Sequence, residues 1–146
     1  MDELVRWLGE QLDFDAAQAT EAGEELGPDW HYDDGFVLAR REGDMVATGS
    51  QDFLEAERGR FIAAQDPARV LAEVDAKRQL LDDYTVTARI RDEAATRIKA
   101  AGDHPDPKDL DTWDRAQMEV AVLEGPVKLA ALPLADRPGY REEWRP

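Results

Sequence analysis

Side chains that could carry out nucleophilic catalysis are few in this sequence. It contains no cysteine, its only serine is Ser50, and its two histidines, His31 and His104, lie far apart along the chain. A serine–histidine–aspartate site would need Ser50 and His31 to meet one of many aspartates, and such a set can be picked from any acidic chain. The sequence therefore predicts no catalytic residue, and we expect a protein that is not an enzyme.

Each histidine stands near aspartates that could complete a site for a divalent metal. His31 precedes Asp33 and Asp34, and His104 lies between Asp103 and Asp106. Imidazole nitrogens and carboxylate oxygens are common ligands of such ions. Neither group has a recognised ligand spacing, however, and aspartates in turns more often accept hydrogen bonds from nearby backbone N–H groups. We expect no metal and no cofactor, and a metal-assisted enzyme that uses His31 stays an alternative.

Basic residues gather in the stretch from residue 77 to residue 99. Lys77, Arg78, Arg89 and Arg91 could hold an anionic small molecule such as a nucleotide, because their side chains donate charged hydrogen bonds to phosphate. Acidic residues lie between them and offer ordinary surface ion pairs instead. These four are the candidate ligand-binding residues, and sequestration of an anionic small molecule is an alternative function.

The first 35 residues are strongly acidic. They hold eleven acidic residues and one basic residue, which gives −10 of the whole chain's −15. Such a surface repels the nucleic-acid backbone and attracts basic proteins. We expect no direct nucleic-acid binding, with a basic protein as one partner, and a DNA-mimic inhibitor is a further alternative. The candidate acidic face for a partner consists of Glu10, Asp13, Glu21, Glu24 and Glu25.

Composition sets the class of the protein. With 146 residues, of which 42% are hydrophobic, the chain suits a single domain with a modest core. The absence of cysteine fits a reducing compartment. No apolar run approaches the roughly 18 residues of a membrane span, and no secretory signal opens the sequence. We therefore expect a cytoplasmic protein that does not bind membranes.

The first half of the chain should hold a helix, a small sheet and a second helix. Apolar residues at helical spacing predict an acidic helix over 1–26, which Gly27-Pro28 ends. Short β-prone runs predict a small antiparallel sheet over 30–50, either a hairpin or a three-stranded meander. A short helix is expected over 51–65.

Two Asp-Pro pairs mark helix starts in the second half. Such a pair joins an N-cap to a proline at the first helical position, where the missing N–H costs nothing. The pairs predict a long helix over 66–101 and a second over 106–132, which Gly125-Pro126 would kink or interrupt. These helices should form an antiparallel hairpin, and the aromatic residues of 133–146 predict a docked tail.

The expected fold is α+β and mainly α, in a single domain that covers residues 1–146. A helix over 66–101 would be roughly 50 Å long, more than the core of a domain this size needs. Some of that length must pack on another helix. Packing within the chain is one solution, and a homodimer through the helical hairpin, with four helices in a bundle, is the other. We expect the homodimer.

Two segments carry a family likeness. Asp66–Arg78, with the sequence DPARVLAEVDAKR, and Leu129–Pro146, with LAALPLADRPGYREEWRP, resemble a family of small uncharacterised acidic proteins of actinobacteria and their phages. The resemblance implies a bacterial, phage or mobile-element context, and it implies no activity, cofactor or catalytic residue. We therefore expect a noncatalytic binding or regulatory protein of that origin.

Overall fold

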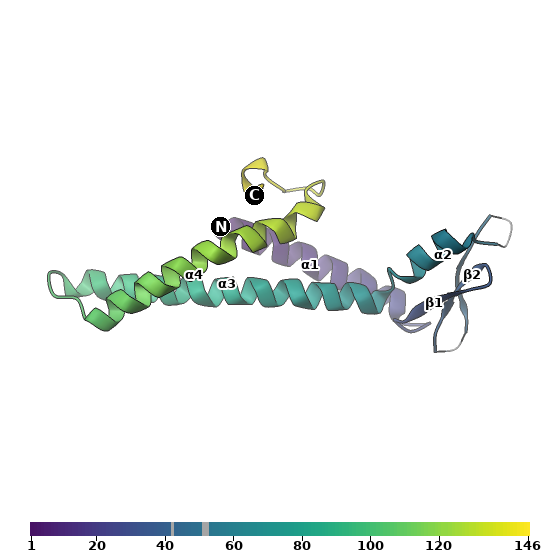
Figure 1. Ribbon diagram of the computed structural model, residues 1–146, viewed down its shortest axis with the longest axis horizontal. Coiled ribbons are helices and arrows are strands. Elements are labelled where there is room, and N and C mark those ends of the chain that lie inside the picture. The colour runs from purple at the N-terminus through teal and green to yellow at the C-terminus, as the bar shows by residue number, and fades with distance from the viewer. Residues whose placement is uncertain (42, 51–52) are drawn as a thin grey trace. The chain divides into compact units, whose positions relative to one another are not determined.

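The computed structural model describes residues 1–41, 43–50 and 53–146, so Glu42, Gln51 and Asp52, which belong to the expected sheet and short helix, lie outside the described residues. The chain has an N-terminal helix, a three-stranded antiparallel sheet and two long helices (Figure 1). The prediction of a mainly helical α+β fold is confirmed. The chain forms two compact units, which we call the sheet unit (residues 11–76) and the hairpin unit (residues 1–10 with 77–146).

The first helix, α1, spans Asp2–Gly23. Asp2 and Glu3 in its first turn complement the positive end of the helix dipole. The helix stops before the expected residue 26 because Gly27 adopts a positive φ of 88° and donates its N–H to the carbonyl oxygen of Gly23, 3.0 Å away. This is a left-handed glycine cap, which satisfies a carbonyl group at the helix end.

The sheet consists of β1 (Trp30–Asp33), β2 (Phe36–Ala39) and β3 (Met45–Thr48), in the order β1-β2-β3. The sequence left two or three strands open, and the structure has three. Asp34 and Gly35 join the first two strands with φ angles of 36° and 96°. Two successive positive φ angles make a tight hairpin turn whose twist matches that of the strands, so this pair determines where the hairpin turns.

Helix α2 spans Ala56–Ala63 and packs on β1 and β2. It is shorter than expected because Leu54 is bound to the β1–β2 hairpin. The N–H of Leu54 donates to the carbonyl oxygen of Gly35 at 2.8 Å, and its own carbonyl accepts from the Tyr32 hydroxyl at 3.1 Å. Gly59 lies directly on the Tyr32 ring, where a Cβ atom would be 2.1 Å from Cδ2. This contact therefore requires glycine.

Helix α3 spans Pro67–Ala101, and Asp66 caps its start. One carboxylate oxygen of Asp66 accepts the N–H of Arg69 at 2.8 Å, and the other accepts the N–H of Trp30 at 3.2 Å. The Asp-Pro pair thus starts the helix as predicted. It also binds the first strand to the helix within the sheet unit.

Helix α4 spans Pro107–Ala131 and begins with the second Asp-Pro pair. Asp106 accepts the N–H of Lys108 at 2.9 Å. The helix passes through Pro126 without ending, so the interruption that the sequence left open does not occur. Helices α3 and α4 form an antiparallel hairpin, drawn in teal and green in Figure 1. Among the described residues, neither these helices nor any other are long and apolar enough to cross a membrane.

The tail after α4 contains two short 3₁₀ helices, Leu132–Leu134 and Glu142–Trp144. The rings of Tyr140 and Trp144 each lie 5.5 Å from the ring of Trp7, measured between centroids. Edge-on and tilted packing of this kind stabilises aromatic clusters. The tail is therefore docked on the first turns of α1, within the hairpin unit.

Each unit buries its own set of apolar side chains. In the sheet unit these include Leu12, Ala19, Val37, Ala39, Ala63 and Val74. In the hairpin unit they include Leu4, Leu8, Leu81, Ala94, Ala116, Val120, Val127 and Ala131. Burial of each larger aliphatic side chain contributes about 1.5–3 kcal/mol.

Candidate functional site

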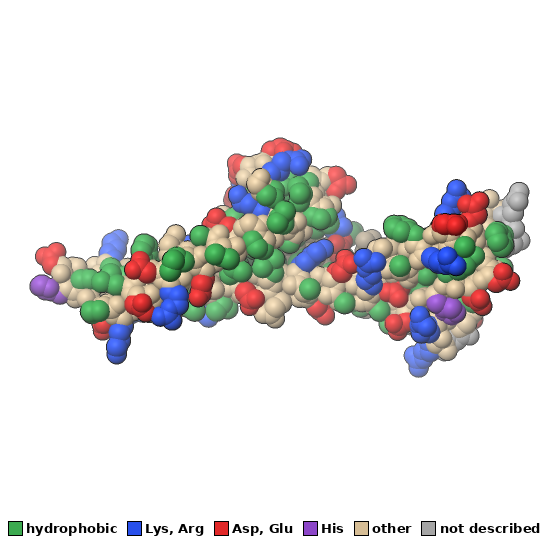
Figure 2. All heavy atoms as spheres, in the orientation of Figure 1, with side chains coloured by type: hydrophobic (Ala, Val, Ile, Leu, Met, Phe, Trp, Pro, Cys, Tyr) green, Lys and Arg blue, Asp and Glu red, His purple; other side chains and the backbone are tan. Residues whose placement is uncertain are grey.

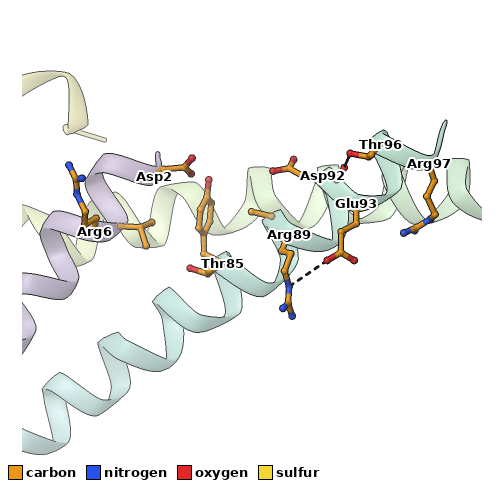
Figure 3. A pocket seen from close by; sticks show the side chains of 11 residues that line it. Asp2, Arg6, Thr85, Arg89, Asp92, Glu93, Thr96 and Arg97 are labelled. Atoms are coloured by element: carbon orange, nitrogen blue, oxygen red, sulfur yellow. Dashed lines mark hydrogen bonds and ion pairs between the residues drawn. The ribbon is translucent and has the colours of Figure 1, made fainter. Parts of the chain in front are cut away.

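A hollow of about 790 Å³ lies in the hairpin unit, between the first two turns of α1 and one face of α3 (Figure 3). From α1, Asp2, Val5 and Arg6 line it, and from α3 it is lined by eight residues between Tyr84 and Arg97. We call this hollow the α3 groove. The groove runs along α3 from Tyr84 to Arg97, past the first turn of α1.

The groove has an apolar floor and a charged rim. Val5, Tyr84 and Ala88 supply the floor, and the Tyr84 side chain is only 4% exposed. Residues three or four positions apart share a helix face, so Thr85, Ala88 and their neighbours one turn further on line the same groove. The charged rim includes Arg89. This arrangement suits an amphipathic ligand.

A second, smaller hollow lies further along the hairpin, toward the loop that joins α3 and α4. Its volume is about 330 Å³, and its lining is almost entirely apolar: Ala95, Ile98 and Lys99 from α3, and Leu110 and Trp113 from α4. Ala95 follows Ala88 of the groove by seven residues, which places the two on the same face of α3 within about 20°. The two hollows therefore adjoin along α3 at Ala88 and Ala95, and we call the surface that contains both of them the hairpin face.

The rim charges of the α3 groove are incompletely paired. Arg89 and Glu93 approach only to 4.0 Å between Nε and Oε1, with both side chains more than half exposed. Arg97 is held by Asp109 of α4 at 2.7 Å. Within the described part of the chain, Arg6 makes no ion pair. Arg6, Arg89 and Glu93 are therefore available to an incoming group.

Tyr84 is held in its protonated form at the floor of the groove. Burial raises the pKa of its phenol, and the carboxylates of Glu124 on α4 and Asp2 on α1 raise it further. Of its neighbours on α3, Arg91 lowers this pKa and Asp92 raises it. Tyr84 therefore presents a neutral hydroxyl group to the groove at physiological pH.

Of the four predicted ligand-binding residues, the structure places only Arg89 in the groove. Arg91 comes two positions later, about 200° further round the helix, and pairs with Asp92 at 2.7 Å. Lys77 and Arg78 come about three turns before Arg89 and line neither hollow. The structure thus does not bring the four residues together.

Sequence reasoning missed Arg6, and it counted Arg97 in the basic stretch from residue 77 to residue 99 without selecting it as one of the four ligand-binding residues. Arg6 lies on α1, and no local sequence pattern predicts that the first turns of this helix lie beside the middle of α3. Arg97 does have a sequence signal, because Arg89, Glu93 and Arg97 are four residues apart and share one side of the helix. That spacing separates them from Arg91.

The predicted acidic face is exposed, but it does not form part of either hollow. All five of its carboxylates lie on the surface: Glu10, Asp13, Glu21, Glu24 and Glu25. Glu24 and Glu25 follow the end of α1 and lie in the turn before Gly27. The acidic face therefore remains a charged surface without a cavity of its own among the described hollows.

The groups considered for metal binding are not assembled into a site. Among the described residues, no three histidine or carboxylate side chains are placed so as to hold a metal ion. His31 lies on β1 opposite Leu38, and its Nδ1 is buried without a hydrogen-bond partner in the described part of the chain. His104 is exposed in the α3–α4 loop, and Asp106 caps α4. This geometry gives the metal-assisted alternative no support.

Helix α4 also carries apolar side chains on the side away from α3. Met118, Val122 and Leu129 are 65%, 72% and 57% exposed, and their spacing puts them on the helix side opposite Val120 and Val127, which are buried. Figure 2 shows hydrophobic side chains among charged ones along the hairpin. We call these three residues the α4 stripe.

Comparisons with known proteins place the chain in a family. No curated protein and no solved structure matches it. A family model with the description "Family of unknown function (DUF6221)" matches residues 1–146. The chain therefore belongs to this family along its whole length.

Proposed function

We propose that this chain is a noncatalytic binding protein that takes an amphipathic helix on its hairpin face. The observation that supports this is the pair of hollows that adjoin along α3, with volumes of about 790 and 330 Å³. In this part of the hairpin, α3 and α4 offer a third helix a place to pack against them. A helix is the element that such a place accommodates.

The surface chemistry of the hairpin face fits a helix. Ala88 and Ala95 are small, so another helix axis could approach to the short end of the usual range, about 8 Å. Trp113 provides a larger apolar wall on the α4 side, and Tyr84 belongs to the buried floor. Apolar residues of a bound helix would lie along this floor, and its polar residues would meet the charged rim.

An anionic small molecule is a second candidate for the same groove. Arg6 has no ion pair in the described chain and Arg89 has a weak one, and both line the groove. The lining also contains Asp2, Asp92 and Glu93, however, so three acidic residues balance its three arginines. This balance favours the helix. Titration calorimetry with ATP and with pyrophosphate would detect the small-molecule mode.

The charge distribution supports two lesser proposals. Residues 1–76 hold nineteen acidic and six basic residues, a net charge of −13. Such a segment suits a basic protein as an additional partner, or a DNA mimic that occupies a DNA-binding protein. Unchanged activity of DNA-binding enzymes in the presence of the protein would count against the mimic. The resemblance of Asp66–Arg78 and Leu129–Pro146 supports an origin in actinobacteria or their phages, and the lack of cysteine in the sequence fits a cytoplasmic location.

Site-specific photocrosslinking tests the proposed function. A photoreactive phenylalanine analogue at Thr85, which lines the α3 groove, should form a crosslink to a helical peptide in cells, and peptide sequencing would identify it. The matched control carries the same analogue at Glu119, which is exposed on α4 and lines neither hollow. A crosslink from Thr85 and none from Glu119 is the expected result. Equal labelling, or none at Thr85, would contradict the proposal.

A further inference from the structure

The charged side chains of the α3 groove are not evenly distributed along it. Asp2 lines the groove together with Tyr84, and its carboxylate acts on the Tyr84 hydroxyl. Figure 3 shows the side chains of Asp2 and Asp92 extending toward each other. In the same view Arg6 and Arg89 point away from that pair. The end of the groove at Tyr84 is therefore acidic, and we call it the acidic end.

A further carboxylate comes from α4. Tyr84 and Glu124 are equally far along the chain from His104, in the loop of the antiparallel hairpin, so they lie at the same level of α3 and α4. Among the charged groups that act on the Tyr84 hydroxyl, Glu124 has the largest effect and Asp2 the next. Neither carboxylate forms an ion pair or a hydrogen bond with another residue of the described chain.

The Tyr84 side chain is almost completely enclosed, yet its hydroxyl has no hydrogen-bond partner among the described residues. The side chain is 4% exposed and lines the groove. The polar side-chain atoms that lack both a partner and contact with solvent belong to His31, Thr48 and Tyr140, so the Tyr84 hydroxyl still reaches the open space of the groove. A buried hydroxyl without a partner is unfavourable. Its oxygen can accept a hydrogen bond from a group that enters the groove.

One basic residue also acts on the Tyr84 hydroxyl. Arg91 lowers the pKa of this group, but its guanidinium is already paired with the Asp92 carboxylate, 2.7 Å away. Three carboxylates and one guanidinium therefore act on the hydroxyl. The pair between Arg91 and Asp92 leaves Asp2 and Glu124 uncompensated, so the acidic end attracts a cation.

The acidic end suits an organic cation better than a metal ion. In the part of the chain that the structure describes, no three carboxylate or histidine side chains lie close enough together to hold a metal ion. A guanidinium group presents five N–H donors in one plane. It can therefore donate to two separated carboxylates and to a hydroxyl oxygen at the same time.

We propose that the helix bound on the hairpin face carries an arginine whose guanidinium group binds between Asp2, Glu124 and the Tyr84 hydroxyl. This inference rests on the proposed function and names the residue by which the partner is recognised. Val5 and Ala88 line the groove beside these groups. They would cover the methylene groups of the arginine, which pack on apolar surface while the charged group reaches its partners.

Charge and size favour an arginine of a helix over a free cation. The chain carries a net charge of −15, which attracts a basic helix from a distance. The two adjoining hollows of about 790 and 330 Å³ hold far more than one guanidinium group. A helix would occupy the rest of the hairpin face, and its arginine would fill the acidic end.

Neutralisation of the two free carboxylates tests the proposed contact. The double variant Asp2→Asn with Glu124→Gln keeps the shape of both side chains and removes their charges. Crosslinking from the photoreactive analogue at Thr85 should fall at least tenfold, because two charged hydrogen bonds to the arginine are lost. Glu119→Gln, exposed on α4 and outside both hollows, is the matched control and should leave the crosslink unchanged. Circular dichroism should show that all variants are folded.

A small probe tests the same site on the wild-type protein. Ethylguanidinium carries the charged group of arginine, and ethylurea is a neutral molecule of similar shape. In a nuclear magnetic resonance titration, ethylguanidinium should shift the ring signals of Tyr84, which Tyr84→Phe assigns, and ethylurea should not. Equal shifts with both probes, or none with ethylguanidinium, would overturn the guanidinium site.

The crosslinked peptide distinguishes failure of this inference from failure of the proposed function. The peptide attached at Thr85 should contain an arginine within about two helical turns of the crosslinked residue. A crosslink that survives the double neutralisation, or a helical peptide without such an arginine, would overturn this inference and keep the groove as a helix-binding site. The absence of any crosslink would contradict both proposals.

Discussion

The indole Nε1 of Trp7 donates a hydrogen bond to the backbone carbonyl oxygen of Pro138, 3.0 Å away and 131 positions later in the sequence. The Trp7 ring also packs against the two aromatic rings of the tail. Because Val5 and Arg6 of the same helical turn line the α3 groove, the docked tail fixes one end of that groove. The aromatic cluster thus holds in place the turn of α1 that lines the proposed site.

Substitution of Trp7 should reveal how much the tail stabilises the fold. Trp7→Phe removes the hydrogen bond and retains an aromatic ring, so we expect a loss of about 1 kcal/mol in the free energy of unfolding. Trp7→Ala also leaves a cavity at a site only 7% exposed, and should cost about 3–5 kcal/mol. Urea denaturation measures both. Met118→Ala, at an exposed site, should change stability by less than about 0.5 kcal/mol. Equal effects of all three would contradict the assigned role.

Gly59 and Gly9 should respond in opposite ways to alanine. At Gly59 the new Cβ would lie 2.1 Å from Cδ2 of Tyr32, so Gly59→Ala must displace α2 or the Tyr32 ring and should destabilise the fold. At Gly9 nothing lies within 4 Å of the new atom, and Gly9→Ala should stabilise α1 by about 0.5–1 kcal/mol. Thermal unfolding followed by circular dichroism compares them. A stable Gly59→Ala variant would show that α2 packs elsewhere.

Tyr84 should make stability fall at alkaline pH. Burial raises its pKa, and the carboxylates of Glu124 and Asp2 raise it further. Arg91 lowers the pKa by a smaller amount. Below the ordinary pKa of about 10, the Tyr84 hydroxyl is protonated in both the folded and the unfolded state, and its contribution to the stability of the fold is fully present. As the pH rises through the folded-state pKa, the unfolded chain has already released the proton, and stability is lost.

Tyr84→Phe should remove this part of the alkaline loss. Urea midpoints measured from pH 8 upward should fall more steeply for the wild type than for the variant, while Tyr32 and Tyr140 remain in both proteins. Parallel curves would show that Tyr84 titrates in the same way in the folded and unfolded states.

The expectation of a single domain remains a prediction, and we propose that the sheet unit and the hairpin unit unfold together. Helices α1 and α3 each contribute residues to both units, so unfolding either unit would break a helix that the other also uses. Differential scanning calorimetry should show one transition with equal calorimetric and van't Hoff enthalpies. Two separate transitions would contradict this proposal.

Local signals account for the part of the fold that could be predicted. Each Asp-Pro pair starts a helix, because the aspartate accepts a backbone N–H near the helix start and the proline needs no hydrogen bond of its own. The number of strands was ambiguous, since Trp30–Asp33 is too short for a clear pattern. The start of α2 was wrong because Leu54 bonds to Gly35, a contact between segments that periodicity does not report.

The candidate site was less accessible to sequence reasoning. Arg89 was identified because it belongs to a basic stretch, but composition alone could not separate it from Arg91, on the other side of the helix. Arg6 and Tyr84 enter the groove only because α1 starts beside the middle of α3. The docked tail was predicted from Tyr140 and Trp144, whereas their contact with Trp7 depends on tertiary packing.

Sedimentation equilibrium of the wild-type protein across the micromolar range tests the central claim most directly. The chain has a mass of 16.4 kDa. If two copies associate through the helical hairpin, as the sequence predicts, the measured mass should rise with concentration toward twice that value. A wild-type mass that stays at 16.4 kDa at every concentration would contradict the account.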